Sequence, residues 1–571
     1  MSDAAPPPES DRRTLDAWAL AAALGSILLQ GHRFGQGNHE IFLPAMRRVL
    51  DASHLAGDWV LATPPGHPLT TYPLAWLSVP LGESWTMLLA QLATRFLLFA
   101  GLWRFGRALL PELPRFGCLV MMLVVVFEPR MRIGGHYLQG PAWESAHLGM
   151  AAALWMSAAG ARWVAEPASR AAALRFGALA GLALCAHLFI GLPLAGVVFG
   201  AALLARAPLT ALASTGGTML ALGAPAWVPA AQGFLADGSA GLSAAETIAL
   251  LQWRHPHHHM PWTWRVVDWL QFALVFGAVA WMSARLGARA LLPRVFLAYY
   301  VVAGLVFVAC GWWLVAPVVA YFQSFRAAGI VWVLLAALFA DAACRAEGWR
   351  WIAYLVLAML GRTAPGLAAT LPVTASPRAL RADLPDPGAR WALAVAGCGA
   401  ALVVALQTVA PLRNALNELR SDYWRVDHTD RDDAREELNR WFRERTPTDA
   451  LVVIPPDLPA FRVAARRAVF LDIKHFPYRA ADLAEWSRRY RLLTGEASPL
   501  ARNWEPQGAR PLAIPDGPPP EVAADYWVFR RSGELDARWG TLAPEGRWRE
   551  AFRNRAYLVL EPVTAAAHSS R

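Results

Sequence analysis

The stretch "LDAWALAAALGSILLQGHRFGQGNHEIFLPAMRRVL", residues 15–50, decides the fold class because its character changes once along its length. Residues 15–31 are apolar and long enough for a membrane span, which needs about 20 mainly apolar residues. Residues 34–59 then gather polar side chains, including Asn38 and the titratable His39, Glu40 and Asp58. Apolar and charged residues interleave here as in an amphipathic helix on a membrane surface. Solvated carboxylates that pair with neighbouring arginines are an equally acceptable interpretation of this segment.

The composition extends this interpretation to the whole chain. Of 571 residues, 56% are hydrophobic and 17% are charged, with a mean hydropathy of +0.30. Soluble domains carry about 25% charged residues, so the sequence predicts a membrane protein with a polar appendage. The net charge of +10 comes almost wholly from arginine, since Lys474 is the only lysine. Basic residues scattered among membrane loops indicate no nucleic-acid partner.

Cysteine usage and the N-terminus add two expectations. The five cysteines lie in apolar runs without paired or metal-ligand spacing, which is typical of small buried hydrophobic residues and predicts no disulfide framework. Residues 1–14 are polar and lack a cleavable signal pattern, so the first apolar run is predicted to be an uncleaved span.

Eleven apolar runs are candidate spans, and arginine placement orients them. Short Arg-rich loops face the cytoplasm, which puts the N-terminus inside and residues from 412 onward outside. The apolar part of 349–390 is too short to cross and is expected to stay cytoplasmic or to dip into the membrane. The candidate spans are 15–31, 84–103, 116–129, 142–161, 172–189, 191–205, 209–231, 266–284, 294–314, 316–340 and 391–411.

The expected fold is therefore mainly α: a polytopic transmembrane helical bundle with a C-terminal soluble α/β domain. Residues 1–14 form a cytoplasmic tail, 15–411 the bundle with a large first outer loop at 32–83, and 412–571 the outer domain. No histidine among the 14 lies in a predicted inside loop, so the titratable chemistry gathers on the outer face.

A second outer element is "FEPRMRIGGHYLQGPAWE", residues 127–144. It carries Glu128, Arg130, His136 and Glu144, with its carboxylates at the ends of two spans. Ionisable groups near membrane depth usually face a bundle interior or a water-filled cavity, which makes them candidates for substrate binding. The alternative is a loop whose charges pair with lipid headgroups.

A third outer element is "LLQWRHPHHHMPWTW", residues 250–264. Arg254, His255, His257 and His258 stand between tryptophans, which are typical of a membrane interface. The histidine spacing matches no zinc signature, so contact with an anionic headgroup or a phosphate is favoured at least equally. Arg326 adds a cation at another outer span end.

The C-terminal domain has the pattern of a small α/β fold of about 150 residues. Thr429 or Asp430 is expected to cap its first helix. Lys474 directly follows a predicted strand, where open α/β sheets bind ligands, although a plain charged loop is the simpler interpretation. The predicted strands are 450–456, 468–473, 525–530 and 556–561, and a further helix is expected at 481–493.

Two short motifs carry a resemblance. An opening of the form FxxxNHxxxLPxxxRxxD is matched by Phe34, Asn38, His39, Leu43, Pro44, Arg47 or Arg48, and Asp51, and an RxPHH loop by Arg254, Pro256, His257 and His258. These motifs are similar to those of a set of bacterial multi-span proteins of unassigned function. The overall layout resembles the GT-C superfamily of integral-membrane glycosyltransferases.

The GT-C resemblance implies transfer of a sugar from a polyprenyl-phosphate donor to an acceptor, at the periplasmic face of a bacterial inner membrane. It implies that an acidic residue of the first outer loop acts as a base or as a ligand of a divalent metal. That role falls on Glu40, with Asp58 second. Where these enzymes usually carry two adjacent acids, this sequence has His39 and Glu40.

Two other classes of function remain open at this stage. One is a non-catalytic protein that binds a lipid-linked saccharide or scaffolds an envelope assembly. The other is a transporter, which is disfavoured because the spans show no internal repeat and few Pro/Gly breaks in matched halves. The sequence names neither sugar, acceptor, metal nor oligomeric state.

Overall fold

The computed structural model divides the chain into two compact units. The helical unit comprises residues 1–32, 88–229 and 256–424, and the mixed unit comprises residues 33–87, 230–255 and 425–571. The residues described are 9–62, 67–126, 138–236, 242–254, 260, 264, 266–309, 323–345, 424–425, 432–477, 480–495, 512 and 514–563.

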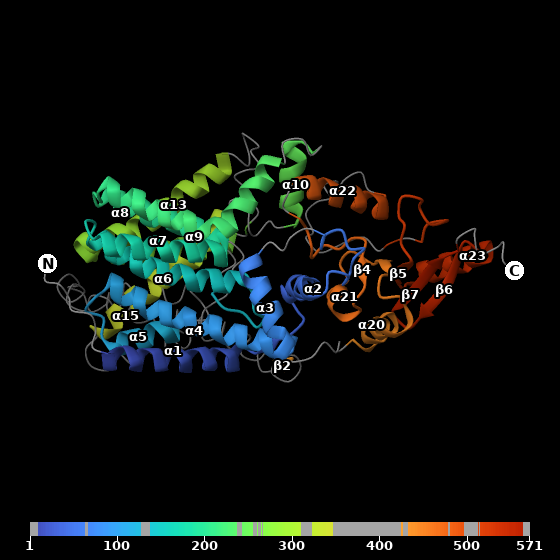
Figure 1. Cartoon of the computed structure of the whole chain (residues 1–571), viewed down its shortest axis with the longest axis horizontal. Coiled ribbons are helices and arrows are strands. Elements are labelled where there is room, and N and C mark those ends of the chain that lie inside the picture. Colours follow the sequence, from blue (N-terminus) through green and yellow to red (C-terminus); the bar gives the residue numbers. More distant parts are fainter. Residues whose placement is uncertain are drawn as a thin grey trace, which may run out of the picture. The chain divides into compact units, whose positions relative to one another are not determined.

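The helical unit is built from long apolar helices that run side by side (Figure 1). Two of them, α4 and α9, extend into the residues of the mixed unit. The helices are α1 (Glu9–Gln30), α4 (Glu83–Leu109), α5 (Arg115–Val126), α6 (Ser145–Ala165), α7 (Arg170–Ala186), α8 (Leu188–Leu204), α9 (Leu209–Ala236), α12 (Val266–Ser283), α13 (Leu291–Val308) and α15 (Gly329–Cys344), with short 3-10 turns η3 (Ala284–Ala290) and η5 (Ser324–Ala327).

The helices place the chain in a membrane. Among the described residues, 83–109, 291–308 and 325–344 are long and apolar enough to cross a bilayer, and 115–126 and 188–204 are shorter apolar helices. Each predicted run from 15–31 to 316–340 overlaps one of the helices, whereas 349–390 and 391–411 lie outside the described residues. The number of spans stays a prediction.

Glycines allow the closest helix contacts in this unit. A Cβ added to Gly160 of α6 would lie 2.5 Å from Val198 Cγ1 of α8. Helices in membranes associate mainly through close packing, which small residues at the interface permit. The α6–α8 contact therefore depends on the missing side chain at position 160.

The mixed unit combines parts of the first outer loop with the C-terminal region. Each of the two-residue strands β1 (His32–Arg33) and β2 (Trp424–Arg425) has its first residue in the helical unit and its second in the mixed unit. The elements are α2 (His39–Leu50), α3 (Pro68–Leu81), α10 (Ala244–Arg254), α20 (Asp433–Arg445), β3 (Leu451–Val453), α21 (Phe461–Ala464), β4 (Ala468–Val469), α22 (Ala480–Thr494), β5 (Tyr526–Arg530), α23 (Gly533–Leu542), η7 (Ala543–Glu545), β6 (Trp548–Arg553) and β7 (Tyr557–Pro562).

A five-stranded mixed sheet forms the core of this unit, in the order β4-β3-β5-β7-β6. β3 pairs in parallel with β4 (Val452 with Val469) and with β5, while β7 pairs antiparallel with β5 and β6. The predicted strands and the helix at 481–493 are confirmed, and β6 is an additional strand. The predicted cap of the first helix is wrong: α20 begins at Asp433, and the side chain of Asp432 accepts a bond from the Ala434 N–H.

The predicted first outer loop contains two helices. The predicted amphipathic helix forms as α2, with Phe42, Leu43 and Met46 buried in the protein and Ile41 and Leu50 exposed. α2 packs against α3 and α21, and its place on a membrane surface stays a prediction. The helix α3 was not predicted, because its prolines and lack of charge give no amphipathic pattern.

A glycine substitution tests the α6–α8 packing. We expect Gly160→Ala to lower the free energy of unfolding by about 1–3 kcal/mol, because the added methyl group overpacks the helix contact. Thermal unfolding of the purified protein measures this effect.

Gly217 of α9 is the matched control, since nothing lies within 4 Å of a Cβ added there. Gly217→Ala is expected to leave the unfolding temperature unchanged or raised. Equal effects of the two substitutions would contradict the proposed packing role of Gly160.

Candidate functional site

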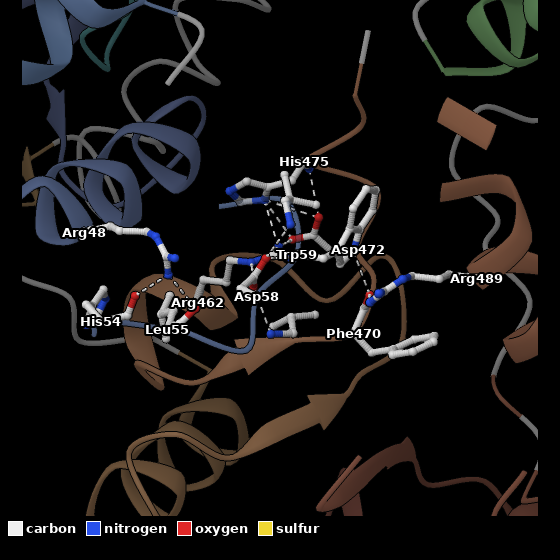
Figure 2. Close-up of polar contacts among 12 residues, drawn as sticks. Arg48, His54, Leu55, Asp58, Trp59, Arg462, Phe470, Asp472, His475 and Arg489 are labelled. Carbon is white, nitrogen blue, oxygen red and sulfur yellow. Dashed lines mark hydrogen bonds and ion pairs between the residues drawn. The ribbon is translucent and has the colours of Figure 1, made fainter. Parts of the chain in front are cut away.

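A buried arginine joins the first outer loop to the C-terminal region. The Arg462 Nε donates to Asp58 Oδ2 at 2.5 Å and its Nη2 to Asp58 Oδ1 at 3.3 Å, while its Nη1 donates to Asp472 Oδ2 (Figure 2). Arg462 is 2% exposed and Asp58 is 0% exposed. Buried charges persist only when they are paired and hydrogen-bonded, so these three side chains form one structural group.

The local fold of residues 48–60 brings Asp58 to this position. Arg48 Nη1 donates to the carbonyls of His54 and Leu55, each at 3.1 Å, and Leu55 adopts a left-handed conformation (φ 54°). Asp58 Oδ2 then accepts the backbone N–H of Val469 in β4 at 3.0 Å. Both carboxylate oxygens of Asp58 are therefore committed to the protein.

Trp59, next to Asp58, also binds the segment that follows β4. Its Nε1 donates to the Phe470 carbonyl at 3.1 Å, and the Arg489 guanidinium of α22 lies 4.9 Å from the centre of the Trp59 ring. Arg489 also donates to the Phe470 carbonyl at 3.1 Å (Figure 2). The segment around Asp58 and Trp59 thus covers the edge of the sheet beside β4.

The turn after β4 carries an Asp–His pair. His475 Nδ1 lies 3.0 Å from Asp472 Oδ2 and 2.9 Å from Arg462 Nη1, and the His475 backbone N–H donates to Asp472 Oδ1 at 2.8 Å. His475 is 6% exposed, and its Nε2 is buried without a hydrogen-bond partner among the described residues. One imidazole nitrogen is therefore held in place while the other is not used by the fold.

The charge of Arg462 controls the ionisation of Asp472. Burial acts to raise the pKa of this carboxyl, but Arg462 and the bonds from His475 outweigh it and hold the pKa well below its usual range. The folded-state pKa lies below the unfolded value of about 3.9, so the stabilisation is present above that pH. It is lost only as the pH falls through the lowered pKa.

Glu40, in the first turn of α2, lies in a different environment. Its Oε2 accepts the backbone N–H of Ala460 at 2.7 Å, and Ala460 itself is left-handed (φ 57°). Burial raises the pKa of the Glu40 carboxyl, and the nearby charge of Lys474 and the bond from Ala460 oppose that rise. A partly buried carboxyl with a raised pKa, within electrostatic range of a cation, is suited to proton transfer.

Arg254, the last residue of α10, contacts the turn that follows β4. Its Nε donates to the Ile473 carbonyl at 2.7 Å, directly before Lys474 in the chain. The neighbouring Trp253 packs against Trp486 of α22, with ring centroids 5.5 Å apart. The residues after strand β4 therefore meet Arg254 and lie within electrostatic range of Glu40, all inside the mixed unit.

The remaining predicted residues fall into three groups. Asn38 is the N-cap residue of α2, and His39 is fully buried, with its Nδ1 accepting the Gly35 N–H at 3.1 Å. Glu144, the N-cap residue of α6, and Arg326, in η5, belong to the helical unit. The residues outside the described part of the chain are Glu128, Arg130, His136, His255, His257 and His258.

Arg462 was missed by sequence reasoning, because a single arginine in a short helix carries no signal of its partners. Asp472 and His475 had a signal, since Asp472 lies at the end of the predicted strand 468–473 and His475 lies just after it. The described residues contain no group of three or more His, Cys, Asp or Glu side chains that could hold a metal ion. The chemistry offered here is that of a carboxyl, an imidazole and a lysine.

Comparison with known proteins gives a family match and distant structural likenesses. A family described as a "Domain of unknown function (DUF6798)" matches residues 433–493, from α20 through α22. No curated protein sequence matches the chain. The matched residues include Arg462, Asp472, Lys474 and His475.

Two crystal structures of ArnT from Cupriavidus metallidurans are similar to this chain, each with 14% sequence identity. The structure bound to undecaprenyl phosphate has a TM-score of 0.44, and the match covers 97% of this chain and 98% of ArnT. The apo structure has a TM-score of 0.46, and the match covers 96% of this chain and 97% of ArnT. The archaeal oligosaccharyltransferase AglB from Archaeoglobus fulgidus, in complex with an inhibitory peptide and a dolichol-phosphate, is 12% identical. It covers 81% of this chain and 64% of its own, with a TM-score of 0.39. Likenesses at these scores carry no conclusion about activity or substrate.

Removing one partner of the buried ion pair tests its structural role. We expect Asp58→Asn to destabilise the mixed unit by about 3–5 kcal/mol, because Arg462 loses the charge of one of its two counter-ions in a buried site. Thermal unfolding and the rate of trypsin cleavage within residues 432–563 measure the effect.

Asp51→Asn is the matched control from the same loop, because Asp51 is exposed and its side chain accepts bonds from Ser53, a near neighbour in the chain. It is expected to change stability little. If the two variants unfold alike, the buried pair is not what holds the loop to the sheet.

Proposed function

We propose that the chain is a glycosyltransferase of the bacterial inner membrane that uses a polyprenyl-phosphate-linked sugar as donor at the periplasmic face. In this proposal the N-terminus is cytoplasmic, the mixed unit is periplasmic, and Glu40 is the base. The observation that carries the proposal is the environment of Glu40: its side chain accepts the Ala460 N–H, burial raises the pKa of its carboxyl, and the only lysine of the chain, Lys474, lies within electrostatic range.

The two carboxylates named from the sequence have different roles in this proposal. Asp58 has both oxygens bound to Arg462 and Val469, so it holds the loop in place. Glu40 accepts one backbone bond and keeps a raised pKa, so it takes the proton. Environments that push the pKa values of two carboxyls apart commonly separate an acid–base group from a structural one.

The proposed step needs one base and cations. As the acceptor hydroxyl attacks the anomeric carbon of the sugar, Glu40 takes the hydroxyl proton, and the bond from that carbon to the phosphate oxygen breaks. Inversion at the sugar needs only this base and no second carboxylate. Lys474 lies in the turn after β4, and Arg254 of α10 binds the Ile473 carbonyl of that turn. Their positive charges suit a phosphate leaving group.

A second candidate is a non-catalytic protein that binds a lipid-linked saccharide. One observation favours it: Glu40 fixes the left-handed Ala460, which is a structural use of the carboxylate. In that case the polar side chains around the turn after β4 recognise the ligand without transferring the sugar. Substitution of Glu40 separates the two candidates.

The test is turnover of polyprenyl-phosphate sugars by the purified protein in lipid nanodiscs, followed as release of polyprenyl phosphate. We expect Glu40→Gln to lower turnover about 10²–10⁴-fold, the usual contribution of a general base. The glutamine oxygen can still accept the Ala460 N–H, so the fold is retained while the base is lost.

Glu444→Gln, an exposed carboxylate of α20, is the matched control and is expected to keep full turnover. A Glu40→Gln protein that turns over like its parent would exclude Glu40 as the base. A folded parent protein that binds the donor lipids but never releases polyprenyl phosphate, with any acceptor offered, would favour the binding protein.

The pH dependence gives a separate prediction. Glu40 acts deprotonated, so turnover rises with pH through its pKa. Lys474 lowers that pKa, and Lys474→Gln removes the positive charge. We therefore expect the acid limb of the pH–rate profile to move to higher pH in Lys474→Gln. Lys474→Arg keeps the charge and should keep the limb in place, and an unmoved limb in Lys474→Gln would contradict the assignment of the limb to Glu40.

A further inference from the structure

The helix α3 has an inverted pattern of burial. Its buried side includes the hydroxyl residues Thr70, Thr71 and Ser78, whereas Trp76 is 66% exposed and Val79 is 64% exposed. Soluble proteins place large apolar side chains inside and polar ones outside. A helix with the opposite arrangement is matched to a surrounding medium that is itself apolar.

The exposed side chains of α3 form one continuous surface. Leu69, Tyr72, Trp76 and Val79 are spaced at i, i+3, i+7 and i+10, so they project from one side of the helix. No Asp, Glu, Lys or Arg occurs between His67 and Glu83. We call these four residues the α3 apolar face.

A one-residue turn connects α3 to α4, a helix with the length and composition of a membrane span. Gly82, with φ 77°, ends α3, and α4 begins at the next residue. The first turn of α4 carries Trp85, which is also largely exposed, and α4 is long and apolar enough to cross a bilayer. The apolar surface of α3 is therefore followed directly by the exposed Trp85, at the start of a helix with the length and apolar composition of a membrane span.

The length of α3 excludes a crossing. Its 14 residues extend about 21 Å at about 1.5 Å per residue, short of the roughly 30 Å of hydrocarbon in a bilayer. Tyrosine and tryptophan, both present on the α3 apolar face or next to it, concentrate where hydrocarbon meets headgroups. The helix has the length and the side chains for the boundary region of one leaflet.

We propose that α3 is a lipid-docking helix: it lies in the boundary between headgroups and acyl chains of one leaflet, with the α3 apolar face toward lipid, and does not cross the membrane. It does this from within the first outer loop. The opposite side of α3 packs on α2, and the Phe42 ring lies 6.0 Å from the His67 ring at the start of α3. The docking therefore holds the helix that carries Glu40 at the bilayer, and it stands whether or not Glu40 is a base.

The test measures which medium surrounds each position. A nitroxide label is placed at Trp76→Cys or Val79→Cys in the full chain with its native cysteines replaced by alanine, reconstituted in lipid nanodiscs. Collision rates with oxygen, which concentrates in lipid, and with a water-soluble nickel chelate are then compared. We expect collisions with oxygen to exceed those with nickel at both positions.

Two reference positions calibrate the result. Leu305→Cys, exposed on the spanning helix α13, reports lipid, and Thr448→Cys, exposed in the mixed unit, reports water. Labels at 76 and 79 that behave like the label at 448 would overturn the proposal. Low collision rates with both reagents would also overturn it, because they indicate that a protein surface covers the α3 apolar face.

If the cysteine variants fail to fold, Val79→Lys offers a second measurement against Val79→Leu. We expect the lysine variant to lose thermal stability in nanodiscs relative to the leucine variant, because its charge enters the apolar boundary. Equal unfolding temperatures of the two variants would contradict the proposal.

Discussion

The two carboxylates around Arg462 are the constraint on which the mixed unit depends. A guanidinium buried to this degree needs charge and hydrogen bonds on both sides, and the chain supplies them from segments far apart in sequence. Asp58 comes from the first outer loop and Asp472 from the turn after β4. Since the positions of α2 and of the residues after β4 follow from this arrangement, so does the neighbourhood of Glu40 and Lys474.

The fold class and most elements could be predicted because they depend on local patterns. Long apolar runs predicted the helices, and short apolar runs in the C-terminal region predicted β3, β4, β5 and β7. Whether an apolar side chain faces lipid or protein could not be predicted from these local patterns. The same periodicity is found in helices that face lipid and in helices that face protein, so the surroundings of the apolar side chains of α2 could not be assigned from it. The helix α3 has no charged residue and therefore gave no amphipathic signal.

The candidate site was predicted in part for a similar reason. Residues such as Glu40 and Lys474 stand out by type and by their place after a span or a strand. The charges that surround these residues cannot be recognised in the sequence, because they come from contacts between distant segments of the chain. Arg462 shows this most clearly: its pairing with Asp58 joins residues 404 positions apart, and no repeat or spacing in the sequence connects them.

That separation has a consequence for how the protein is made. Ribosomes add about 5–20 residues per second, so Asp58 emerges about 20–80 seconds before its partner, given a gap of 404 residues. During that interval neither the guanidinium of Arg462 nor the backbone N–H of Val469 in β4 is present to bind the Asp58 carboxylate. Chain termination before Arg462 would leave this intermediate permanently exposed, and its open loop would be a target for proteases and chaperones on the side of the membrane where it is delivered.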